Sequence, residues 1–449
     1  MRLESPSTKA GLVLCSLFLG STVLSGNAAA EKILSKDGDW TLWSEGRAGG
    51  FVSYVRGDGY PNDAFGDWTN PATGQSGSGK LHDVVGGGLP DVREQGVDAN
   101  GRPTQGTLEG VRVRSGMIGN TFGFGARGPV TPYTTAKAFI QIWAFVENDG
   151  RNKTNLNMAD VRQGYVKLEG GWGSLVVGRA RGLFSRGATD IDVLYAHGFG
   201  LGFPGSIDGR GPTQGHIGFG VLGSGFASGV IYATPVLAGF QLTVGGFDPL
   251  VLGGGGSWTR TKWPRAEGEL TMERPISDFG KVVLFGNGGY QKVYQGGTIT
   301  ESVTGAGFGY GGRLELGRFH LGVAGHYGVG LGLNYALEVS PAAQDATNHL
   351  RKFDGYYVQT QVVLGKVDLS AGWGITRVFL NAADNVVDPT TGKIPTSVLK
   401  HQLGYSAGVV YHVRPWLHVD VDVFRADFAW FLEEKQVAYI ANSGMMLTW

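Results

Sequence analysis

The chain has little cysteine and, beyond its N-terminal region, no long hydrophobic run. Cys15 is the single cysteine among 449 residues, so no disulfide can form within one chain. Beyond residue 30, no segment approaches the ~20 consecutive apolar residues that a membrane-spanning helix needs. These two absences exclude a disulfide-stapled scaffold and a helical membrane protein.

The sequence also lacks an excess of charge of either sign. It carries 38 Lys and Arg residues against 38 Asp and Glu residues, and its formal net charge is zero. This balance gives no sign of the basic surface that binds nucleic acid. The nine histidines are scattered without the spacing of a metal site, so we expect neither a metal nor a cofactor.

Residues 1–30 have the features of a secretory signal peptide. Two basic residues precede an apolar run over residues 10–24, and Ala28 and Ala30 have the small-x-small spacing that a signal peptidase requires. We predict cleavage after the second of these alanines. The cysteine is then lost, and residues 31–449 form the mature domain.

Alternation of polar and apolar residues with a period of two is the dominant pattern in the mature chain. Segment 417–423 places His418, Asp420 and Asp422 on one face and Leu417, Val419, Val421 and Val423 on the other. Segments 318–327, 366–373 and 402–413 alternate in the same way, and the last strand ends on the aromatic Trp449. The 78 glycines suit strands joined by tight turns. This combination is typical of outer-membrane barrels.

A soluble β-sandwich would show the same alternation, so the connections decide between the two folds. Short links alternate with long polar links, as periplasmic turns and outer loops do in a transmembrane barrel. The longest link, 57–107, is interpreted as an outer loop. The predicted strands are 40–56, 108–127, 134–147, 158–169, 173–180, 224–235, 237–248, 264–275, 280–294, 304–316, 318–336, 353–364, 366–379, 399–413, 416–428 and 437–449.

The predicted fold is therefore all-β, a transmembrane antiparallel β-barrel of about 16 strands, the even number that such barrels have. Hydrocarbon offers no partner for backbone N–H and C=O groups, so the first and last strands should pair and leave no free edge. A barrel of this size is too wide for side chains to fill. We therefore expect a water-filled lumen and a place in the outer membrane.

Two stretches match motifs of a known family. One is V-R-Q-G-Y-V-K-L at 161–168 with W-G-S-L-V-V-G-R at 172–179, and the other is G-V-I-Y-A-T-P-V-L-A-G-F at 229–240. They resemble strands of the general, usually trimeric, porins of Gram-negative outer membranes. The resemblance implies passive diffusion of small hydrophilic solutes and ions through a homotrimer. It also implies contact with outer-membrane lipid and lipopolysaccharide.

The resemblance further implies a constriction in the pore. In the family, the loop after the fifth strand folds into the lumen and presents acidic side chains to arginines on the wall. The matching loop is 181–223, and Arg162 matches the arginine of the fourth strand. Several arginines at the root of the loop favour a mild anion preference. The candidate constriction residues are Arg112, Arg114, Arg162, Arg179, Arg181, Asp190, Asp192 and Asp208.

Two other functions remain open from the residues alone. One is a channel specific for a sugar or an anion, in which Phe139 and Trp143 would form an aromatic lining. The other is a barrel enzyme with a Ser-His dyad. Ser406 and His412 share a strand face but lie too far apart to pair directly, and no nucleophile elbow is present. We therefore predict that the protein is not an enzyme.

Overall fold

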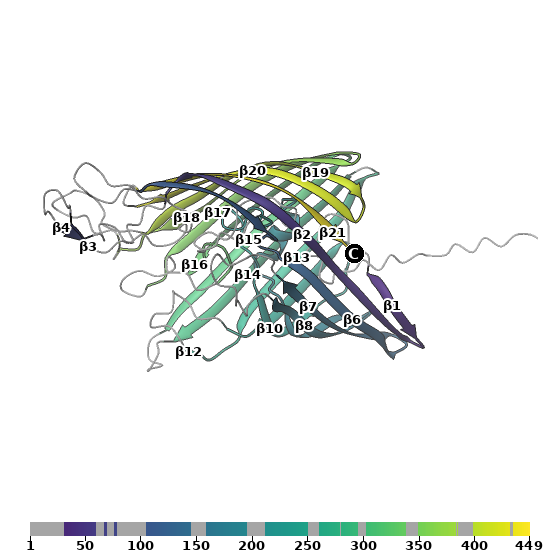
Figure 1. Ribbon diagram of the computed structural model, residues 1–449. Helices are drawn as coiled ribbons and strands as arrows, with labels where there is room; N and C mark the ends of the chain where they lie inside the picture. Colours follow the sequence, from purple (N-terminus) through teal and green to yellow (C-terminus); the bar gives the residue numbers. More distant parts are fainter. Residues whose placement is uncertain are drawn as a thin grey trace, which may run out of the picture.

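The computed structural model is a closed, antiparallel β-barrel (Figure 1). It describes residues 31–59, 67–69, 76–78, 105–144, 159–194, 212–249, 260–278, 280–294, 302–337, 349–382, 384, 398–431 and 434–449. Within these ranges, sixteen strands form the wall. The predicted signal peptide, 1–30, lies outside the described residues and stays a prediction.

The wall strands follow one another in chain order, and each pairs with its neighbours. They are β2 (Trp40–Asp58), β5 (Thr107–Arg114) with β6 (Asn120–Thr131), β7 (Thr134–Ala144), β8 (Ala159–Gly170), β9 (Gly173–Arg181), β10 (Phe226–Ala233), β11 (Phe240–Phe247), β13 (Arg265–Ser277), β14 (Gly280–Tyr294), β15 (Ser302–Leu316), β16 (Phe319–Val329), β17 (Lys352–Leu364), β18 (Val367–Phe379), β19 (Leu399–Arg414), β20 (Leu417–Trp430) and β21 (Lys435–Thr448). β5 and β6 together make one wall strand, because both pair with the same edge of β2.

Four short strands and one helix lie outside this series. They are β1 (Lys32–Asp37), which forms a hairpin with β2, the pair β3 (Asp67–Thr69) and β4 (Ser76–Ser78), β12 (Arg260–Thr261) beside β14, and α1 (Arg186–Ile191). β3 and β4 belong to the predicted outer loop 57–107. In the described ranges, no helix is long and apolar enough to cross a membrane.

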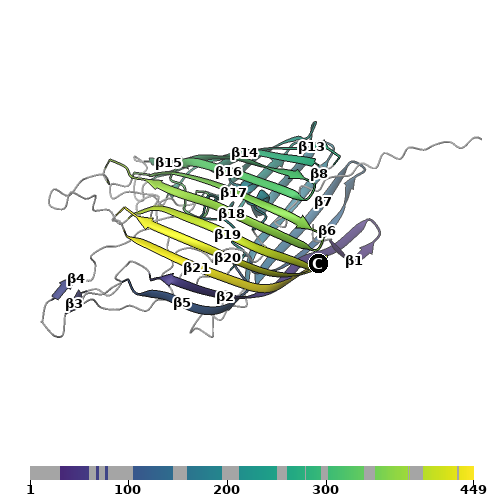
Figure 2. The ribbon, with the colours of Figure 1, turned by 90° about the horizontal axis from the view of Figure 1, so that it is seen from above.

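The barrel closes between its first and last wall strands, as the sequence predicts. β2 pairs with β21 from Arg47 opposite Thr448 to Gly57 opposite Ala438. Figure 2 shows β21, β2 and β5 side by side at this seam. The wall therefore presents no open edge to hydrocarbon there, which is the condition for crossing a membrane with strands.

The two ends of the barrel differ. At the turn end, the turns at 171–172, 317–318, 365–366 and 415–416 join neighbouring strands. The C-terminus and β1 lie near this end, whereas β3 and β4 lie beyond the opposite one, the loop end (Figure 1). Outer-membrane barrels have short turns in the periplasm and long loops outside, so the turn end is the periplasmic one.

The wall separates apolar from polar side chains. On β20, Val419, Val421 and Val423 are exposed on the outer face, whereas Asp420 and Asp422 are buried on the lumen side. The same alternation runs through the other wall strands, with exposed Val, Leu, Phe and Tyr outside. This is the arrangement that a lipid-facing barrel requires.

Two predicted strands are cut short by segments that enter the barrel. Strand 108–127 is interrupted at 115–119, where Gly116 has a φ of +93° and the Met117 N–H donates to the Pro212 carbonyl at 2.8 Å. Strand 318–336 ends at Val329, and residues 330–337 turn into the lumen. We name residues 330–337 the second inner segment. In both cases, contacts with a part of the chain that is distant in sequence replace the backbone hydrogen bonds to the neighbouring strand.

Candidate pore constriction

The connection between β9 and β10 folds into the barrel. We name it the inner loop; residues 182–194 and 212–225 of it are described. At its start, one oxygen of Glu267 on β13 accepts hydrogen bonds from the Leu183 N–H at 2.6 Å and the Phe184 N–H at 3.0 Å. Asn287 on β14 accepts a third, from the Ser185 N–H at 3.0 Å. These wall side chains hold the start of the loop against β13 and β14, the third and fourth wall strands after β9.

The inner loop then crosses toward β17, β18 and β19. Gln359 on β17 donates to the Ile191 carbonyl and accepts from the Val193 N–H at 3.0 Å. Further along, the Gly220 N–H donates to the Thr376 hydroxyl at 2.9 Å, and Gln402 donates to the Gly218 carbonyl. Because side-chain amides and hydroxyls from three strands satisfy its backbone, the loop is docked rather than loosely placed.

Two of the predicted constriction residues meet directly. The Arg181 Nη1 atom lies 2.5 Å from the Asp190 Oδ1 atom, and the Arg181 Nε–H donates to Ser224 at 2.7 Å. Asp190 keeps 40% of its side chain exposed, so its charge faces water in the lumen. The neighbouring Arg186 pairs with Glu269 on β13.

Asp192 does not share that position. It is 1% exposed and accepts hydrogen bonds from the N–H groups of Leu194 and His216, each at 2.9 Å. Its carboxylate therefore stabilises the conformation of the inner loop and is not exposed to water in the lumen. Asp208, the third predicted acid, lies outside the described residues and stays a prediction.

Arg162 reaches the lumen through a β-bulge. The pairing of β7 with β8 shifts between Gln141 and Ile142, which leaves Arg162 as the extra residue. Its guanidinium carbon lies 4.9 Å from the centre of the Trp143 ring, and its Nε atom lies 2.9 Å from an Asp160 oxygen. In a regular strand, neighbouring residues face opposite sides of the wall. The bulge breaks this alternation, so Arg162 and its neighbour Gln163 both face the lumen.

The other predicted arginines are divided between the two faces. Arg112 and Arg114 alternate with the outward Val111 and Val113, so both belong to the lumen face; Arg114 is buried. Arg179 pairs with Gly164 and Ser228, in step with the outward-facing Val177, so the alternation of β9 favours the outer face for it. Its place in the constriction stays a prediction.

The comparisons with known proteins agree with this architecture. A family model described as Gram-negative porin matches residues 21–436. The chain belongs to the Gram-negative porin family. The porin's fold is similar to that of the outer membrane channel DcaP of Acinetobacter baumannii, with a TM-score of 0.63 and 12% identity over 93% of this chain and 100% of the other. An anion-selective porin from Comamonas acidovorans gives a TM-score of 0.54 and 12% identity over 91% of this chain and 100% of the other. A search of curated proteins finds no match.

The porin is thus a channel of the Gram-negative outer membrane and not an enzyme. Ser406 does meet a histidine, but it is His216 of the inner loop, at 3.3 Å between the hydroxyl and Nε2, and not His412. Asp192 lies on the other side of that ring. All three side chains are buried, so the trio offers no entry for a substrate and serves to dock the loop.

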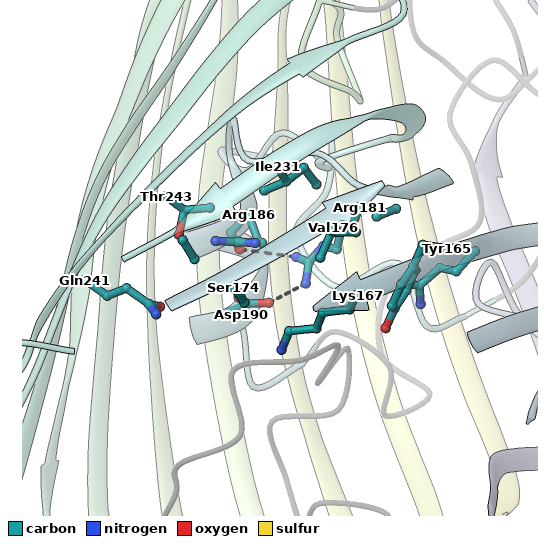
Figure 3. A pocket seen from close by; sticks show the side chains of 13 residues that line it. Tyr165, Lys167, Ser174, Val176, Arg181, Arg186, Asp190, Ile231, Gln241 and Thr243 are labelled. Carbon is teal, nitrogen blue, oxygen red and sulfur yellow. Dashed lines mark hydrogen bonds and ion pairs between the residues drawn. The ribbon is translucent and has the colours of Figure 1, made fainter. Parts of the chain in front are cut away.

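Among the described residues, an open pocket lies in the lumen beside the root of the inner loop. It is lined by strands β8 to β11 and by the loop. Figure 3 shows Lys167, Arg181, Arg186 and Asp190 around it, with the apolar side chains of Val176 and Ile231. Ionic and apolar groups therefore share its wall.

A row of basic residues beside this pocket was not predicted from the sequence. Arg127, Lys137 and Lys167 lie directly opposite one another on β6, β7 and β8. Glu31 lies 2.6 Å from Arg127 and 3.8 Å from Lys137, and Glu169 lies 2.7 Å from Lys167. The signal was present in the sequence, because each of these cations has the parity of an inward residue.

Proposed function

We propose that this porin passes small hydrophilic solutes and ions by passive diffusion, with a mild preference for anions. The observation that carries the proposal is the position of the pocket, where Lys167 and Arg181 line the open lumen beside the docked inner loop. Opposed charges at a narrowed, water-filled passage create a transverse field that apolar solutes tolerate poorly. Nearby carboxylates balance most of the positive charge, so the preference should be weak.

A channel specific for one class of organic anion is the second candidate. The apolar side chains of Tyr165, Val176 and Ile231 share the pocket with Lys167 and Arg181, a combination that suits an anion with an apolar body. A sugar-specific channel has less support, because Trp143 and Phe139 are both buried and present no open aromatic surface. Trp143 packs against Phe226 and Arg162 instead.

Contact with lipopolysaccharide and assembly as a homotrimer belong to the same proposal. Near the loop end, Arg425 lies on the outer face, and its guanidinium carbon is 5.6 Å from the centre of the Tyr439 ring. The guanidinium carbon of Arg377 is likewise 5.6 Å from the centre of the Tyr356 ring. Aromatic residues with cations at this level suit the boundary between acyl chains and phosphate groups. The trimer rests on resemblance to the family, and chemical cross-linking of the purified protein in detergent tests it.

The experiment that tests the channel proposal is a planar-bilayer recording in a salt gradient. We expect large, ohmic steps in the single-channel current and a small reversal potential whose sign corresponds to anion preference. Added sugars should not block the current. Saturable block by one organic anion would move the conclusion to the specific channel. Clear cation selectivity would contradict the anion preference while leaving the channel itself intact.

A further inference from the structure

The second inner segment is joined to the inner loop by backbone hydrogen bonds. The Gly223 N–H donates to the Asn334 carbonyl at 2.7 Å, and the Ala336 N–H donates to the Gly223 carbonyl at 3.0 Å. Gly223 and Tyr335 thereby form a parallel β-bridge. Gln402 on β19 ties both pieces to the wall, since its amide donates to the carbonyls of Gly218 and Leu333. The two loops therefore form one internal unit.

This unit has its own hydrophobic core inside the barrel. Leu331, Leu333 and Leu337 of the second inner segment are buried together with Phe184, Phe219 and Leu222 of the inner loop and with lumen-facing residues of several wall strands. At ~25 cal/mol per Å² of buried apolar surface, a cluster of this size contributes substantially to keeping the unit in place.

Two glycines of the wall shape its seat. Gly289 on β14 and Gly307 on β15 lie directly opposite each other. A Cβ on either residue would lie 2.9 Å from the Phe184 ring, and also about as close to Leu337 or Leu331. The absence of side chains here lets both inner pieces dock on the same spot of the wall.

The unit covers the lumen face of β17 to β20. Gln359 is 2% exposed, Thr376 and Gln402 are 0% and Phe424 is 2%. The first three are hydrogen-bonded to the backbone of the inner loop. Across the lumen, β8 to β11 and the root of the inner loop line the open pocket. Among the described residues, the unit and the pocket therefore lie on opposite sides of the lumen.

We propose that the second inner segment is a fixed constriction element, which together with the inner loop closes the lumen along β17 to β20 and confines permeating solutes to a path along β8 to β11. The inference rests on the proposed channel function and deepens it, because it makes residues 330–337 determinants of pore width. Solutes then pass Lys167 and Arg181 on every crossing.

Cysteine accessibility tests the path without relying on conduction. With Cys15 replaced by serine, the chain is free of cysteine, and single cysteines are placed at Ser406 on β19 and at Ser174 on β9. We expect a charged methanethiosulfonate reagent to label Ser174→Cys and to leave Ser406→Cys protected. When residues 331–337 are replaced by a Gly-Ser linker, Ser406→Cys should label roughly tenfold faster or more, because its protection depends on the docked unit. Equal labelling of both positions in the intact protein would overturn the proposal.

Conductance tests the width. The linker variant should show a single-channel conductance about twofold higher, since the lumen of a barrel of this size is open when nothing folds into it. The matched control is the labelling rate of Ser174→Cys, which should not change and which reports an intact barrel. A folded linker variant with unchanged conductance would contradict the proposal. If neither the intact protein nor the linker variant conducts, the proposed channel function is contradicted. The labelling rates would still decide whether the unit covers β19.

A disulfide lock covers the case in which the linker variant does not fold. In Gly223→Cys with Tyr335→Cys, the new side chain at position 223 points to the space that the Tyr335 ring leaves, because a Cβ there would lie 2.7 Å from that ring. A fixed element predicts the same conductance before and after oxidation. A fall in current on oxidation would show that the two pieces must separate during conduction, and would overturn the proposal.

Discussion

Gly46 exchanges two backbone hydrogen bonds with Trp449, the last residue of the chain, at 2.9 and 3.0 Å. A Cβ on Gly46 would lie 2.4 Å from the Thr121 carbonyl oxygen and 2.6 Å from the Trp449 ring. The ring also packs against Phe122, with 5.5 Å between centroids. The seam of the barrel therefore depends on a position without a side chain.

Gly46→Ala should consequently destabilise barrel closure by about 1–3 kcal/mol, the usual cost of overpacking. Gly50→Ala is the matched control on the same strand and face, because nothing lies within 4 Å of a Cβ there. Heat-modified migration on SDS gels gives the midpoint for each variant. Equal midpoints for the two substitutions would show that the terminal contact does not limit stability.

Glu267 should be essential for docking the inner loop. Besides its two backbone donors, it pairs with Arg265 at 2.7 Å, and both side chains are 3% exposed. Glu267→Gln leaves a buried arginine without its carboxylate, which costs about 3–5 kcal/mol. Thermal unfolding of the purified barrel measures the loss.

Glu273→Gln on the same strand is the control for that experiment. Glu273 lies 3.2 Å from Lys281 and is 47% exposed, so its removal should cost at most about 1 kcal/mol. A similar loss for both variants would mean that the contacts of Glu267 with the loop contribute nothing specific.

The fold was predictable from the sequence wherever alternation stays regular over a strand, and the site was predictable only in part. Residues 330–337 continue the apolar alternation through Leu331, Leu333 and Tyr335, so a local pattern cannot tell them from a strand. The interruption at 115–119 has the same cause, since it depends on a contact with Pro212. In both places a distant partner decides the conformation.

The site residues show the same limit. The resemblance points to Arg162, but its inward position depends on a bulge that no spacing rule reveals. Arg179 is a candidate because it lies at the root of the loop, whereas the alternation of β9 favours the outer face for it. Asp190 and Asp192 look equivalent in sequence, and only the docked loop separates a wetted carboxylate from a buried one.

That difference between the two aspartates can be measured. Asp190→Asn should raise the ratio of anion to cation permeability by roughly twofold, because one exposed negative charge leaves the pocket. Asp192→Asn should instead cost about 1–3 kcal/mol of stability, since an amide cannot accept both backbone N–H groups on oxygens. Reversal potentials and thermal midpoints are recorded for both. The reverse pattern would place Asp192, and not Asp190, in the ion path.

Arg162 and Arg179 can be compared in the same way, because the structure places Arg162 on the lumen face of the wall and the alternation of β9 favours the outer face for Arg179. Arg162→Gln removes a cation from the lumen beside Trp143, so the permeability ratio should shift toward cations by roughly twofold. Arg162→Lys keeps the charge and should keep most of the selectivity, although it loses the planar stacking on the ring. Arg179→Gln should leave the reversal potential unchanged, because the alternation of β9 favours the outer face for that side chain. A shift with Arg179→Gln as large as that with Arg162→Gln would mean that the field in the pore depends on the total charge of the wall and not on the charge that the bulge brings into the lumen.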